Sequence, residues 1–160
     1  MSNFYSSATA RSPKAAEQYV GLTFDKSVLL FKQRDIYSFE SLVDVDADSR
    51  KSNSLGVINV SGYEVPVYCL DDDLSVVKSI PDSRSVCVIL KGHNCALLCK
   101  DIRVLDFDEM KEFDLPECMS HQYMPVSKIC IYRKPNSPED KVSMLVSSEN
   151  LEVYIAKNSR

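Results

Sequence analysis

The sequence is poor in glycine, histidine and tryptophan, and these shortages exclude several kinds of site. It contains four glycines, two histidines and no tryptophan. Phosphate-binding loops bring glycine-rich backbone close to an anion, usually where a helix begins. The glycines here are scattered and form neither a GxGxxG pattern nor a Walker-type run; they are Gly21, Gly56, Gly62 and Gly92. Nucleotide binding is therefore not expected.

The chain also lacks a long apolar run and an excess of positive charge. No apolar stretch approaches the roughly 18 residues that a membrane-spanning helix needs. The N-terminus lacks the basic start and apolar stretch of a secretory signal. The formal net charge is −4, whereas nucleic-acid binders use a basic face to neutralise phosphates. We therefore expect a cytoplasmic protein that neither binds nucleic acid nor inserts into a membrane.

Cysteine is present, but its spacing does not favour chemistry. Five of the six cysteines lie in apolar runs, which favours buried free thiols in a reducing compartment. Cys95 and Cys99 lie on one predicted strand, where four residues span roughly 13 Å, too far for two ligands of one zinc ion. Cys118 and His121 have better spacing, but no second ligand pair stands close by in the sequence. We predict no metal, no cofactor and no catalysis, with a Cys118–His121 enzyme as the less favoured alternative.

Two acidic stretches could attract a divalent cation. Asp71-Asp72-Asp73 lacks the alternation of a calcium-binding loop. Asp44, Asp46 and Asp48 do alternate, but no glycine stands at the sixth position and no glutamate at the twelfth. Both stretches are predicted to be solvated loops.

Short apolar runs separated by turn residues predict an all-β protein. The clearest signal is a hairpin in which Leu55–Val60 and Tyr63–Leu70 flank Ser61-Gly62. Further strands are predicted, together with a short helix following Ser147; the strands are 19–25, 27–32, 86–90, 95–99, 102–107, 126–132 and 142–146.

Other segments carry weaker signals. Residues 35–43 place an apolar residue at every third position, which suits one or two helical turns. Residues 108–122 are read as irregular, and 1–16 as a flexible tail before a folded region of 17–157. Two loosely similar halves suggest two small packed barrels.

The segment LGVINVSGYEVPVYCL, from Leu55 to Leu70, resembles the hairpin of the CheW family of chemotaxis coupling proteins. The family pattern reads approximately G-V/I-x-N-L-R-G-x-x-V/I-P-V/I-x-D-L. Two further stretches resemble later strands of that family in the same order; they are 85–105 and 126–151. Ser61 stands where the family has arginine, and Cys69 and Lys100 stand where it has aspartate. Serine lacks the reach and the five donors of an arginine side chain.

The resemblance implies two five-stranded β-barrels packed together, without an active site. It also implies an adaptor that bridges the cytoplasmic tips of chemoreceptors to the regulatory domain of a CheA-type histidine kinase, in a chemotaxis or a pilus (twitching) motility complex. Matched positions imply a receptor-facing turn and two groove residues; they are Asn59, Val60, Ser61, Gly62, Val86 and Leu105. For Val60, Val86 and Leu105, core packing is an equally good interpretation. A peptide-binding barrel that acts outside chemotaxis by strand addition is the other alternative.

Overall fold

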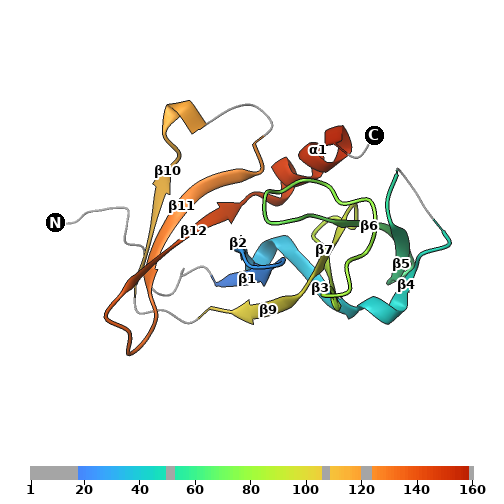
Figure 1. Ribbon diagram of the computed structural model, residues 1–160, viewed down its shortest axis with the longest axis horizontal. Helices are drawn as coiled ribbons and strands as arrows, with labels where there is room; N and C mark the ends of the chain where they lie inside the picture. Colours follow the sequence, from blue (N-terminus) through green and yellow to red (C-terminus); the bar gives the residue numbers. More distant parts are fainter. Residues whose placement is uncertain (1–17, 50–52, 106–108, 120–123, 159–160) are drawn as a thin grey trace.

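The computed structural model describes residues 18–49, 53–105, 109–119 and 124–158, and the predicted tail 1–16 lies outside them. Two six-stranded sheets and a C-terminal helix make up the fold (Figure 1). The first sheet contains β1 (Tyr19–Thr23), β2 (Val28–Lys32), β9 (Asp101–Val104), β10 (Glu109–Asp114), β11 (Val126–Arg133) and β12 (Asp140–Val146). The second contains β3 (Ile36–Ser41), β4 (Val45–Asp46), β5 (Gly56–Val60), β6 (Tyr63–Cys69), β7 (Val86–Leu90) and β8 (Ala96–Cys99). The helix α1 is Ser148–Asn158, and the short 3-10 turns are η2 (Gln33–Asp35), η3 (Leu42–Asp44) and η4 (Glu117–Met119).

The strands β1 and β2 lie in the first sheet, the next six strands, β3 to β8, form the whole second sheet, and β9 to β12 complete the first. The strand orders are β10-β11-β12-β2-β1-β9 and β3-β7-β8-β6-β5-β4. Each sheet contains one parallel pair, β12 with β2 and β6 with β8, and the other strand pairs of the described residues are antiparallel. The all-β prediction is confirmed. Each sheet has six strands where the resemblance implied five, and in the second sheet β4 is only two residues long.

Three apolar clusters hold these elements together. The largest lies between the sheets and joins residues of both to Leu151 and Ile155 of α1. A second fills the inside of the second sheet, and a third the inside of the first. Along β7 and β8, alternate side chains belong to the largest and to the second cluster, so both faces are buried. This explains why these two strands read as continuous apolar runs.

The predicted β5–β6 hairpin is confirmed. Ser61 and Gly62 both have positive φ, 51° and 85°, as the favoured two-residue hairpin turn requires. Val65 and Val67 share a face and are fully buried. At the other end of β5, a Cβ on Gly56 would lie 2.7 Å from the carbonyl oxygen of Asp46. Glycine therefore allows the close approach of β4.

Two segments differ from the sequence-based expectation. Residues 36–41 form β3 instead of helical turns, with a bulge between Ile36 and Ser38 where the strand pairs with β7. Pairing with an apolar neighbour thus overrides the local three-residue spacing. Residues 109–114 form β10, within the segment read as irregular. Its inward position Glu112 is polar and accepts a hydrogen bond from the hydroxyl of Tyr19, so the apolar alternation typical of a strand is missing.

Among the described residues, no helix has the length and apolar character needed to cross a membrane.

Candidate partner-binding surface

The tip of the β5–β6 hairpin carries four of the six predicted partner-binding residues. Asn59, Ser61 and Gly62 are exposed, and Val60 is 8% exposed and packs in the second cluster. For Val60, core packing is therefore the interpretation that fits. The side chain of Asn59 stands opposite Glu64 across the hairpin. The tip thus presents backbone and polar groups on a turn whose geometry is fixed.

An aromatic cluster holds this tip in place, and we call its members Tyr37, Tyr63 and His93 the aromatic platform. The His93 and Tyr63 rings stack at 4.2 Å with 17° between their planes. The Tyr37 ring lies 4.1 Å from His93 at 59°. The Tyr37 hydroxyl and the Ser61 hydroxyl are hydrogen-bonded at 2.8 Å. Three elements, β3, the β5–β6 hairpin and the β7–β8 turn, thereby meet at one place.

No local sequence pattern indicates this cluster, because its members are far apart in the chain. His93 lies in a predicted hairpin turn, and its positive φ of 62° is a turn conformation. Its backbone N–H donates to the carbonyl of Leu90 at 3.1 Å.

The two predicted groove residues lie elsewhere. Val86 is partly buried at the start of β7 and is paired with Cys99, whereas His93 lies in the turn that joins the opposite ends of β7 and β8. Leu105 directly follows β9 of the first sheet and packs against the third cluster. The structure therefore brings Asn59, Val60, Ser61 and Gly62 together, and it places Val86 and Leu105 apart from them.

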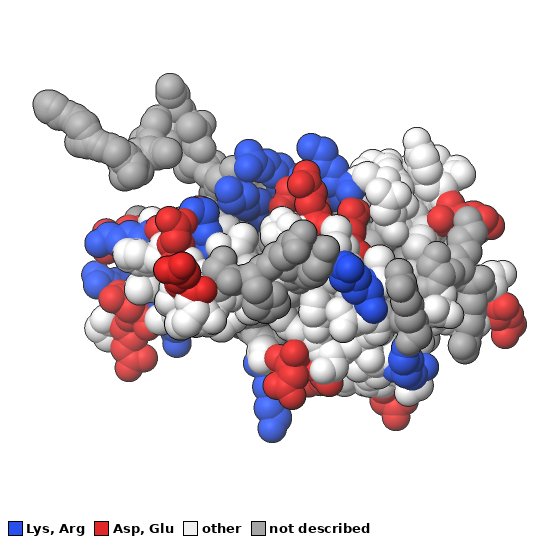
Figure 2. Space-filling view, turned by 90° about the horizontal axis from the view of Figure 1, so that it is seen from above, with Lys and Arg blue, Asp and Glu red and all other residues white. Residues whose placement is uncertain are grey.

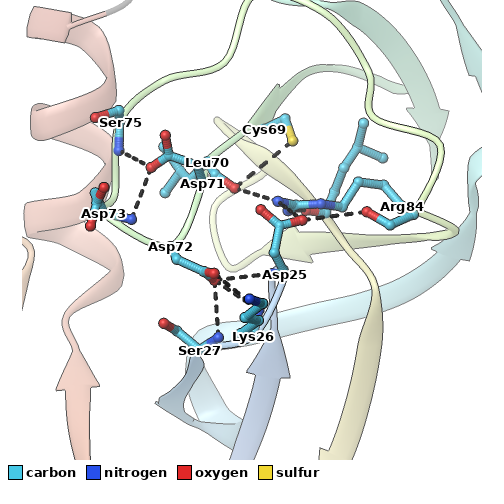
Figure 3. A network of polar contacts seen from close by, with 12 residues as sticks. Asp25, Lys26, Ser27, Cys69, Leu70, Asp71, Asp72, Asp73, Ser75 and Arg84 are labelled. Carbon is cyan, nitrogen blue, oxygen red and sulfur yellow. Dashed lines mark hydrogen bonds and ion pairs between the residues drawn. The ribbon is translucent and has the colours of Figure 1, made fainter.

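A buried arginine joins the two sheets, and sequence reasoning missed it. Arg84 lies in the β6–β7 connection and is 1% exposed. Its guanidinium donates to the carbonyls of Leu98 at 3.0 Å and Leu70 at 2.8 Å, both in or beside the second sheet (Figure 3). It also lies 3.1 Å from the carboxylate of Asp25, in the β1–β2 turn of the first sheet. Charge-assisted hydrogen bonds of this kind are what a buried cation requires.

The acidic stretch after β6 fastens the same turn. One carboxylate oxygen of Asp72 accepts hydrogen bonds from the backbone N–H groups of Asp25, Lys26 and Ser27, at 2.9–3.1 Å (Figure 3). These donors, Ser27 first, hold the pKa of Asp72 below its ordinary value. Asp71 accepts from the backbone N–H groups of Asp73 and Ser75. These carboxylates thus stabilise the conformation of the two loops through hydrogen bonds to backbone N–H groups.

The second acidic stretch is also engaged locally. The carboxylate of Asp46 accepts from the hydroxyl of Ser49 at 2.9 Å and from the backbone N–H of Asp48 at 3.0 Å. These hydrogen bonds, that of Ser49 foremost, lower the pKa of Asp46. Within the described ranges, no group of three or more His, Cys, Asp or Glu side chains is arranged to hold a metal ion.

Five cysteines are buried and one is exposed. Burial raises the pKa of Cys69 to about 11 and that of Cys87 and Cys130 to about 12. The pKa values of Cys95 and Cys99 are also raised by burial, and both side chains lie in the largest cluster. Raised pKa values keep these thiols protonated and unreactive near neutral pH. Cys118 is exposed within η4, and its predicted partner His121 lies outside the described residues.

Charge is distributed unevenly on the face shown in Figure 2. Lys, Arg, Asp and Glu side chains intermingle toward the end formed by the first sheet. A broad uncharged area lies at the upper right, toward the end formed by the second sheet.

Comparisons with known proteins give a fold but no sequence relative. No family model matches the chain, and no curated protein matches it in sequence. Among solved structures, the fold is similar to that of the scaffolding protein TtCheW from Thermoanaerobacter tengcongensis. The TM-score is 0.57 and the sequence identity 15%, over 82% of this chain and 88% of that one. The chain therefore has a CheW-like all-β fold, across nearly the whole length of that structure.

Proposed function

We propose that this chain is a non-catalytic cytoplasmic adaptor that couples chemoreceptors to a CheA-type histidine kinase. The observation that carries the proposal is the likeness in fold to a scaffolding protein over 82% of this chain. A chemotaxis array and a pilus (twitching) motility array are both settings in which such an adaptor works. The hairpin tip Asn59–Gly62 is the proposed receptor-facing surface.

The geometry of the tip supports this role. An exposed turn that is already ordered loses little conformational freedom when a partner binds, and this favours affinity. Ser61 and Gly62 are fixed by their turn and by the hydroxyl of Tyr37. Kinase binding is assigned to a different surface, since one adaptor must hold both partners at once.

Strand addition by a peptide is the alternative, and the edge strand β10 is its natural place in the first sheet. However, β10 reads EMKEFD and none of its six residues is buried. Charged side chains along an edge strand discourage pairing with further strands. This disfavours strand addition at β10.

The test measures the two partners separately. Calorimetric titration of the chain with a receptor tip fragment, and with a kinase regulatory domain, is expected to give Kd values at or below about 100 μM. Asn59→Lys places a long charged side chain at the tip and is expected to weaken receptor binding at least tenfold, with kinase binding unchanged. Asn136→Lys makes the same change in the exposed β11–β12 loop and serves as the control. Absence of binding to both partners at 100 μM would contradict the proposal.

A further inference from the structure

The aromatic platform does more than hold the hairpin. Tyr63 is 54% exposed and Tyr37 is 46% exposed, although both rings contact His93. One ring face of Tyr63 is occupied by the stacked imidazole, so its exposed area belongs to the other face and the ring edge. The Tyr37 ring is fixed through its hydroxyl bond to Ser61. Two tyrosine rings therefore present surface to solvent in a fixed geometry beside the hairpin tip.

The charges on the strands that carry Tyr37 and Tyr63 indicate which kind of side chain could bind to the aromatic platform. The β5 and β6 strands of the hairpin contain Glu64 and no lysine or arginine. The strand β3, which carries Tyr37, contains Glu40 and no basic residue. Two basic residues border the platform in sequence. Lys91 lies in the β7–β8 turn and its backbone N–H donates to the carbonyl of Asp35, and Arg34 lies in η2, three residues before Tyr37. The strands that carry the tyrosines thus offer negative charge only.

We infer that the aromatic platform receives an arginine side chain of the protein partner that docks at the hairpin tip, an inference that rests on the proposed function. The face of an aromatic ring is electronegative and attracts a cation within about 6 Å of its centre. Arginine fits better than lysine because its planar guanidinium stacks on a ring. The acidic side chains on the neighbouring strands, Glu40 and Glu64, also attract a cation.

The chain offers a matched control in the first sheet. Phe113 on β10 is 46% exposed, the same fraction as Tyr37, and its strand contains Glu109, Glu112 and Asp114 as well as Lys111. Substituting Phe113 therefore removes a similarly exposed ring that has acidic neighbours but is not part of the aromatic platform. Tyr63→Leu and Phe113→Leu are therefore the pair of variants to compare.

The experiment is an NMR titration of the full chain with N-acetyl-arginine amide up to about 100 mM. The neutral isostere N-acetyl-citrulline amide is titrated in parallel. We expect saturable shifts at the ring signals of Tyr37, Tyr63 and His93 with the arginine probe, and shifts at least fivefold smaller with citrulline. Tyr63→Leu is expected to reduce the remaining shifts at least fivefold, whereas Phe113→Leu leaves them unchanged. Proton spectra of both variants establish that they are folded.

Three results would overturn the inference: no saturable shift with the arginine probe, equal shifts with citrulline, or the same loss in both variants. The proposed function is judged apart from this, by the partner titrations. If receptor binding is measured but is insensitive to Tyr63→Leu, the inference alone is wrong. If neither partner binds while the arginine probe does, the adaptor role is wrong and the cation site stands.

Discussion

The central strands of the second sheet and the outer strands of the first differ in how many of their faces they bury. In the second sheet, all four residues of β8 are buried, because one face packs inside the sheet and the other against the first sheet and α1. In the first sheet, none of the six residues of β10 is buried. Along β12 the same face changes from 1% exposed at Val146 to 38% at Met144 and 66% at Val142. The central strands β7 and β8 of the second sheet are thus an interior layer, and the outer strands of the first form a surface layer.

This difference predicts where substitutions lower the stability of the protein and where they are tolerated. Substitutions in an interior layer leave cavities that neighbours cannot fill, whereas a surface strand tolerates changes at its solvent-facing positions. Arg84 lies where the two sheets meet, and it bonds to both. Three sets of substitutions test the comparison, beginning at this junction.

Removing the buried arginine is expected to have the largest effect. Arg84→Ala leaves the carbonyls of Leu70 and Leu98 and the carboxylate of Asp25 without their donor, which is expected to lower the free energy of unfolding by about 3–5 kcal/mol. Arg103→Ala is the control, because Arg103 pairs with Asp101 on the surface and both side chains are about half exposed. Its cost is expected to stay below about 1 kcal/mol. Urea unfolding measures both, and equal losses would show that the junction does not join the sheets.

The second test uses one residue type in both layers. Val88 is fully buried between the sheets and Val142 is 66% exposed on β12. Val88→Ala is expected to cost about 2 kcal/mol, from lost burial and the cavity left behind. Val142→Ala is expected to change stability by no more than about 0.5 kcal/mol. A similar cost at both positions, measured by urea unfolding, would mean that a partner or another segment covers the β12 surface.

The smallest expected effect concerns the loop that fastens the β1–β2 turn. Asp72→Asn removes the charge that accepts three backbone N–H groups and is expected to cost about 1 kcal/mol or less, since the site is partly solvated. Asp73→Asn, at an exposed neighbour, is the control.

The pH dependence of this effect has a definite sign. The pKa of Asp72 is lowered in the folded chain from an ordinary value of 3.8. A lowered pKa means that the stabilisation is fully present above 3.8 and is lost as the pH falls through the lowered value. The stability gap between the natural chain and Asp72→Asn should therefore close in acid. Thermal unfolding measured from pH 7 to pH 2.5 checks this, and a gap of constant size would rule out the carboxylate as its origin.

Strands with a buried apolar face could be predicted from the sequence, whereas an exposed outer strand could not. The β5–β6 hairpin was predictable because Ser61-Gly62 and the inward Val65 and Val67 are local signals. The strand β10 was not, because its inward Glu112 is satisfied by a tyrosine from a distant strand. Local patterns reveal strands with a buried apolar face, and they fail where a polar contact replaces it.

The candidate site was predictable only in part. The turn Asn59–Gly62 followed from a family resemblance, and its residues lie together on an exposed tip. The stacking of His93 on Tyr63 and the burial of Arg84 depend on partners from other elements. No spacing along the chain encodes such contacts, so they required the three-dimensional structure.

The route of the chain through the sheets has a consequence for folding during synthesis. The second sheet is assembled from one continuous stretch, β3 to β8, so all of its strands have been synthesised before β12 exists. The first sheet instead needs both ends of the chain, because β12 pairs with β2 through Met144 and Leu29. Closing a contact of such long range is slow. The nascent chain therefore acquires its hairpin tip early and completes its first sheet last.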